Sequence, residues 1–231
     1  MHRHLLALVL VFATACGSAY AGDVTGSVYF KGTAPKPKRI VMTGDPRCST
    51  LSKEPAYTED VIVNPNGTLR NVIVSVKSSP ASAKTPPLAQ KVSLNQRGCR
   101  YVPHVLALMI GQTLEVVNDD PTLHNVHTLS SANAAFNIAQ PKQGMKLDRA
   151  FTRAETFRVK CEVHPWMSAY IGVFDTPYFF VTGDDGSFTL KGLPPGEYVL
   201  EAWHERYGTR TVTVKVPAKG VISTNIDYAL H

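Results

Sequence analysis

Apolar and polar residues alternate in short runs along most of the chain, and this period of two predicts β-strands rather than helices. The runs are rich in valine, isoleucine, threonine and aromatic residues, which favour extended backbone. The strands we expect are Val24–Phe30, Val61–Val63, Asn71–Val76, Leu106–Ile110, Thr113–Val117, Thr156–Val159, Ala169–Phe174, Phe179–Val181, Ser187–Leu190, Tyr198–Trp203, Thr211–Val216 and Val221–Tyr228.

Turn-forming residues separate these runs, as in Asn66-Gly67, Asp184-Asp185-Gly186 and Pro194-Pro195-Gly196. The sequence therefore predicts an all-β protein built from sandwiches. We expect one short helix, near Ala132–Asn137.

The first 21 residues have the pattern of a secretory signal peptide: a basic start, an apolar run at Leu5–Ala15 and small residues up to Ala21. We expect cleavage after Ala21 and a periplasmic or secreted mature protein. A retained anchor is the alternative, but the apolar run is short for a bilayer. A lipoprotein modified at Cys16 is another, although no leucine stands three positions before it.

The composition is that of a folded protein, with 44% hydrophobic and 18% charged residues among 231 and a net charge of +6. No second apolar stretch is long enough for a membrane span. The positive charge is diffuse except at Lys31–Arg39, whose prolines predict a solvated connector. A nucleic-acid patch is the alternative, but no aromatic residues are interleaved with the basic ones, and we expect no nucleic-acid partner.

The segment that carries chemistry is Cys161-Glu162-Val163-His164-Pro165-Trp166-Met167, preceded by His124-Asn125-Val126-His127. A thiolate, two imidazoles and a thioether form the ligand set of a blue-copper site. A loop between two strands can turn Cys161, His164 and Met167 towards one ion, while His124 arrives from a separate segment after the expected strand Thr113–Val117.

These residues resemble the cupredoxins, and amicyanin and plastocyanin most closely. The resemblance runs from Gly111 through His124 to Met167 and implies a Greek-key β-sandwich over about residues 91–175. By position it implies that His124 and His164 are imidazole ligands of one copper ion, that Cys161 is the thiolate and that Met167 is the axial thioether.

The resemblance also assigns residues around the metal. Asn125 is expected to stabilise the Cys161 sulfur and to tie the two ligand loops together. On a strand, His127 would share the face of Asn125 and oppose that of His124, so we expect it beside the site rather than on the metal. His164 would reach the surface among Pro165 and Trp166 and act as the electron port.

Other chemistries fit the sequence less well. Zinc competes because Cys-x2-His resembles half a zinc finger, but no second close pair of ligands exists. Trp203-His204-Glu205 begins like a metalloprotease motif and lacks the second histidine, and no nucleophile elbow, P-loop or dinucleotide motif occurs. We expect the protein not to be an enzyme. The role of His104 stays open.

With Cys161 committed to the metal, the mature chain has Cys48 and Cys99 left. In an oxidising compartment we expect these two to form a disulfide.

The C-terminal part, about residues 176–231, resembles the transthyretin-like, carboxypeptidase regulatory-like β-sandwiches through its Asp185-Gly186-Ser187-Phe188 and Leu193-Pro194-Pro195-Gly196-Glu197-Tyr198 motifs. The opening strand of that family matches Asp23–Tyr29 instead, at the other end of the mature chain. Residues 22–90 are therefore either a separate β region or contribute strands to the C-terminal sandwich.

These features predict a type 1 copper protein that carries single electrons between redox proteins, such as a dehydrogenase or a cytochrome. A copper carrier or sensor, and a structural module without redox function, are the alternatives.

Overall fold

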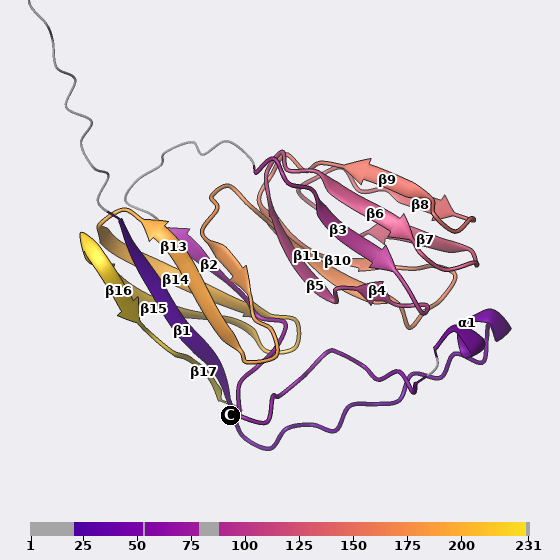
Figure 1. Cartoon of the computed structure of the whole chain (residues 1–231), viewed down its shortest axis with the longest axis horizontal. Coiled ribbons are helices and arrows are strands. Elements are labelled where there is room, and N and C mark those ends of the chain that lie inside the picture. Colours follow the sequence, from indigo (N-terminus) through magenta and orange to yellow (C-terminus); the bar gives the residue numbers. More distant parts are fainter. Residues whose placement is uncertain (1–20, 53, 79–87, 230–231) are drawn as a thin grey trace, which may run out of the picture.

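The computed structural model describes residues 21–52, 54–78 and 88–229 (Figure 1). The signal peptide expected at residues 1–21 lies outside this part, except for Ala21. The described residues form one short helix and 17 strands, so the all-β prediction is confirmed. In chain order they are β1 (Ala21–Lys31), α1 (Pro46–Leu51), β2 (Ile73–Ser78), β3 (Val92–Gln96), β4 (Tyr101–Val102), β5 (Val105–Met109), β6 (Leu114–Asn118), β7 (His124–Thr128), β8 (Asn137–Gln140), β9 (Lys146–Arg149), β10 (Glu155–Lys160), β11 (Ser168–Phe174), β12 (Phe179–Val181), β13 (Ser187–Leu193), β14 (Gly196–His204), β15 (Gly208–Val216), β16 (Lys219–Ser223) and β17 (Ile226–Ala229). No helix within the described ranges is long and apolar enough to cross a membrane.

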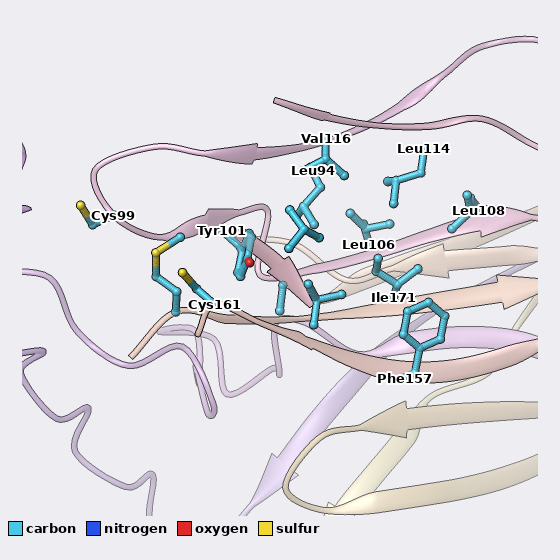
Figure 2. Packing of buried hydrophobic residues seen from close by; sticks show 14 of the residues in the cluster. Leu94, Cys99, Tyr101, Leu106, Leu108, Leu114, Val116, Phe157, Cys161 and Ile171 are labelled. Atoms are coloured by element: carbon cyan, nitrogen blue, oxygen red, sulfur yellow. The ribbon is translucent and has the colours of Figure 1, made fainter. Parts of the chain in front are cut away.

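Strands β3 to β11 form the first sandwich. One sheet has the order β5-β11-β10-β7-β8 and the other has the order β4-β3-β6-β9. Strand β6 shows the expected alternation of buried and half-buried residues, and its buried face packs into an apolar core between the sheets. Figure 2 shows Cys161 and Tyr101 at the end of this core that lies nearest Cys99, with Leu108 and Phe157 at the opposite end.

The remaining strands form the second sandwich, which draws on both ends of the chain. Strand β1 pairs with β13 on one side and runs parallel to β16 and β17 on the other. Strand β2 lies between β12 and β14. The first sandwich is thus inserted in the chain between β2 and β12, two paired strands of the second sandwich. The assignment of the second sandwich to the transthyretin-like family stays a prediction.

The single strand expected at Val221–Tyr228 is two strands, because the chain steps around Gly26. Strand β1 pairs with β16 up to Thr25 and with β17 from Val28 onward. At the step, a Cβ on Gly26 would lie 1.7 Å from the carbonyl oxygen of Thr224. The crossing therefore requires glycine.

The helix expected near Ala132–Asn137 is wrong. Ala132 and Asn133 lie in a bend, residues 134–136 have no regular structure, and Asn137 begins β8. The carboxylate of Glu155 accepts hydrogen bonds from the backbone N–H groups of Ser131 and Ala132, and Ser130 bonds Asn133. Side chains here satisfy backbone groups that a helix would have paired, and such local bonds compete with helix formation.

The helix that does form, α1, belongs to a segment that leaves β1, crosses to the first sandwich and returns to β2 (Figure 1). Asp45 caps the helix through a hydrogen bond from the Arg47 N–H, and Pro46 follows at its first turn. The segment closes on itself where the N–H of Ile40 donates to the carbonyl of Ala56. We call residues 40–56 the cap segment. Its Met42, Cys48 and Ala56 side chains pack into the core of the first sandwich.

Candidate metal centre

Two separate segments bring the predicted ligands together. His124 is the first residue of β7, and Cys161, His164 and Met167 lie on or beside the loop between β10 and β11. This loop is tightly turned: the N–H of Met167 donates to the carbonyl of His164, and the N–H of Cys161 donates to the carbonyl of Met167. The turn folds the two ends of the motif against each other, beside the start of β7.

Three ligand atoms converge. The Nδ1 atoms of His124 and His164 lie 3.0 Å apart, and the Cys161 sulfur lies 3.8 Å from the His164 Nδ1. One donor atom from each of these three residues falls within 4.8 Å of the other two, so together they could hold one metal ion. The Met167 side chain is buried in the same core cluster as Cys161.

Each imidazole is held from behind by a carboxylate. The Nε2 of His124 lies 2.9 Å from an oxygen of Asp120, and the Nε2 of His164 lies 3.0 Å from an oxygen of Asp45. A carboxylate only accepts, so each Nε2 carries a proton, and in the neutral form of either ring Nδ1 presents a lone pair. Two facing lone pairs at 3.0 Å beside a sulfur repel one another, so a cation belongs among them, either a proton on the Nδ1 of His124 or a metal ion.

The electrostatics favour an ionised thiol. Burial acts to raise the pKa of Cys161, but hydrogen bonds from His124 and from the backbone N–H of Asn125 lower it overall. Burial acts to lower the pKa of His124, but its bonds with Asp120 and Cys161 raise it overall. The hydrogen bond from His164 lowers the pKa of Asp45. The thiolate, which is the form that binds metals, therefore forms more readily here than in a free thiol.

The expectation that His164 reaches the surface is wrong. The His164 side chain is 1% exposed, because the cap segment lies over it. The sulfur of Cys48 lies 3.4 Å from its Nε2, beside the Asp45 contact. Of the other two residues of the predicted port, Pro165 is exposed and Trp166 is half-buried, with its indole N–H bonded to the carbonyl of Cys99. Nothing in the loop motif indicates that a distant segment would cover the histidine.

The neighbouring residues lie as follows. The side-chain oxygen of Asn125 accepts from the N–H of Glu162, 2.6 Å away, so this side chain joins the two ligand segments. His127 is partly exposed and pairs with the carboxylate of Glu162. It lies beside the loop and does not belong to the group of three ligand atoms.

The disulfide predicted between Cys48 and Cys99 is present. It joins the cap segment to the turn between β3 and β4. That turn is also bound to Asp120, whose two carboxylate oxygens accept from the N–H groups of Gly98 and Cys99. The disulfide therefore links the segment that contains Asp45 to the turn that holds Asp120.

Asp45 and Asp120 were not predicted from the sequence as partners of the ligand histidines. Asp120 precedes His124 by four positions in a turn-rich stretch, which gave a weak signal. Asp45-Pro46 is a helix-start signal in itself, but only the disulfide prediction indicated that this helix lies near the first sandwich.

Two further histidines lie where the sandwiches meet. His104, in the first sandwich, pairs with Glu205 of the second sandwich and also contacts the carbonyl of Ser168. Neighbouring His204 is buried, which lowers its pKa to about 4. The His104–Glu205 pair joins the two sandwiches, whereas His204 stacks on Tyr207 within the second.

No family model matches the chain, and no curated protein matches it either. Among solved structures, the chain is similar to a copper-containing nitrite reductase from Thermus scotoductus SA-01, with 24% identity over 43% of this chain and a TM-score of 0.32. The match spans 25% of that reductase. A purple cupredoxin from Nitrosopumilus maritimus is 25% identical over 32% of this chain and 80% of its own, with a TM-score of 0.29. A variant of amicyanin in its Cu(I) form is 20% identical over 43% of this chain and 97% of its own, with a TM-score of 0.33.

Proposed function

We propose that the protein is a type 1 copper protein that carries single electrons between redox partners in the periplasm or outside the cell. The observation that carries the proposal is the convergence of His124 Nδ1, His164 Nδ1 and Cys161 Sγ at a buried point of the first sandwich. Copper held there would take up and release one electron at a time.

The donor set fits copper rather than the competing zinc. Two imidazoles, one thiolate and a thioether match the preferences of a copper site with a weak axial methionine. Two facing Nδ1 atoms and a thiol whose pKa is lowered supply the lone pairs that a metal ion would bind in place of a proton. Structural zinc sites have four strong ligands, and we expect the fourth here to be the weaker Met167.

The residues around the ligands hold the site rigid. Asp45 and Asp120 fix the two rings, and Asn125 ties the ligand segments together. All four proposed ligand side chains are at most 2% exposed. A closed and fixed ligand set changes little between two oxidation states, which suits electron transfer better than metal delivery. It also leaves no position for a substrate, so we expect no enzymatic activity.

Electron exchange requires a contact surface near the ligands. Because the cap segment covers His164, we propose that partners contact the exposed apolar side chains of Leu123 and Val163, each adjacent in sequence to a ligand. Mixing oxidised and reduced protein and measuring NMR line broadening gives the self-exchange rate. Val163→Lys should lower this rate, whereas Val221→Lys, at an exposed apolar position of the second sandwich, should not.

The test of the metal site is titration of the purified protein with Cu(II). We expect one equivalent to bind and to produce an intense visible band, since that band requires sulfur bonded to Cu(II). Cys161→Ser should abolish the band, Met167→Leu should retain it with a raised reduction potential, and His127→Gln should behave as the wild type. Weak and exchangeable copper would favour a copper carrier, and absence of uptake would overturn the proposal.

A further inference from the structure

Asp45 lies outside the first sandwich in sequence and contacts one of its proposed ligands. It belongs to the cap segment, which comes from the connection between two strands of the second sandwich. The Cys48–Cys99 disulfide attaches this segment to the first sandwich three residues after Asp45. Met42, three residues before Asp45, packs into the core of the first sandwich and fixes the cap segment there.

Both oxygens of the Asp45 carboxylate have defined partners. Oδ1 accepts from the Arg47 N–H at 2.8 Å, which is the cap of α1. Oδ2 lies 3.0 Å from the His164 Nε2 and 3.3 Å from the Thr122 hydroxyl, two residues before His124. The hydrogen bond at the start of α1 thus orients the Asp45 carboxylate so that its other oxygen, Oδ2, faces His164.

We propose that Asp45 is a positioning residue that keeps the proton of His164 on Nε2 and so keeps Nδ1 free to bind the metal. A neutral imidazole has one protonated and one unprotonated nitrogen, and the partner of one nitrogen sets the state of the other. Asp120 does the same for His124 from within the first sandwich. The cap segment therefore completes the proposed centre. The effect of Asp45 on the His164 proton is independent of the proposed function, whereas its effect on copper binding rests on that function.

The competing interpretation is that Asp45 serves α1 alone. Two variants separate the roles, because asparagine and serine both cap helices well. In Asp45→Asn, the amide oxygen keeps the hydrogen bond from the Arg47 N–H, so the NH₂ group faces the Nε2 of His164. An NH₂ group donates, so it requires an unprotonated Nε2 and thereby favours a proton on Nδ1. In Asp45→Ser, the hydroxyl caps the helix but is too short to reach His164. Glu54→Gln removes a charge from an exposed part of the same segment and is the matched control.

The first experiment needs no metal. In ¹⁵N NMR of the metal-free protein at pH 8, we expect His164 to show a protonated Nε2 in the wild type and in Glu54→Gln. Asp45→Asn should shift the proton to Nδ1, and Asp45→Ser should give a mixture of both forms. A wild-type Nε2 proton in both Asp45 variants would overturn the proposal.

The second experiment uses copper. Loss of such an outer partner weakens metal binding by about 10- to 100-fold, and we expect this loss for Cu(II) in both Asp45 variants. Since a carboxylate partner favours Cu(II), the reduction potential should rise by about 59 mV for each tenfold loss confined to Cu(II). If the wild type binds no copper but the NMR result holds, the proposed function fails and the positioning role stands. If copper binds equally well to all variants, the positioning role fails and the proposed function stands.

Discussion

Removal of the Cys48–Cys99 disulfide should destabilise the first sandwich selectively. Both sulfurs are buried in its core, and the bond closes a loop with a sequence separation of 51. In the chain-entropy treatment a loop of this length lowers the unfolded-state entropy enough to contribute about 4 kcal/mol. For a unit of about 100 residues, such as this sandwich with its cap segment, that corresponds to a fall of about 16 to 32 °C in its melting temperature.

The assay uses the two tryptophans of the chain, because they lie in different sandwiches, although the Trp203 ring also contacts Tyr170 of the first sandwich. Trp166 lies in the ligand loop and Trp203 on β14. In a Trp203→Phe background, urea unfolding followed by the fluorescence of Trp166 should move to lower denaturant in Cys48→Ala/Cys99→Ala. In a Trp166→Phe background, the Trp203 transition should move much less.

Two controls accompany this experiment. Reduced wild-type protein keeps both sulfur atoms and should lose nearly as much stability as the double variant. Cys161→Ala removes the free thiol and keeps the disulfide. A loss below about 1 kcal/mol, or an equal loss in both tryptophan transitions, would refute the assignment of the disulfide to the first sandwich.

Three other changes test the fold and its titrating groups. Gly26→Ala should destabilise the second sandwich by about 1 to 3 kcal/mol in urea unfolding, because its Cβ would meet the Thr224 carbonyl; Gly183→Ala, which meets nothing within 4 Å, should be near neutral. Burial acts to raise the pKa of Glu155, but hydrogen bonds from Ser130, Ser131 and Ala132 lower it overall, to about 2. Its contribution is therefore complete above its ordinary pKa of about 4.5 and is lost as the pH falls towards 2, so Glu155→Gln should be less stable than the wild type at pH 7 and equal to it near pH 2. Burial acts to lower the pKa of His104, but Glu205 raises it overall. The contribution of this pair is complete below pH 6.5 and is lost as the pH rises through the raised value, so Glu205→Gln should cost stability at pH 6 and much less at pH 9 in thermal unfolding.

Local patterns in the sequence predicted many of the strands and picked out His124, Cys161 and His164, whose donor atoms converge in the structure. Alternation fixes which face of a strand is buried, and it located β1, β6, β11 and β14 to within a few residues. The ligand loop is equally local, since Cys161, His164 and Met167 lie within seven residues. The short strands β3, β7 and β9 were missed because they carry polar side chains, such as Gln96, His124 and Asp148, that bind residues elsewhere in the chain.

The covering of His164 is not a local property. Asp45 lies 119 positions from His164 in the chain, and no periodicity links two residues at that distance. The failed helix near Ala132 has the same origin, because the side chain of Glu155, from a different strand, binds the backbone there. Long-range hydrogen bonds decided both cases, and single-sequence patterns do not report them.

The insertion of the first sandwich also sets an order for folding as the chain is made. The strands of the first sandwich are contiguous in the chain, so they can assemble as soon as β11 has emerged, and Cys99 can then bond the waiting Cys48. Strand β1, by contrast, has been synthesised long before its partners β13, β16 and β17, which come last. Until then Val24, Val28 and Phe30 have no sheet to enter and form an apolar edge open to other chains. Strand β1 is thus among the last to find its place, and a chaperone that holds it through that interval would raise the yield of folded protein.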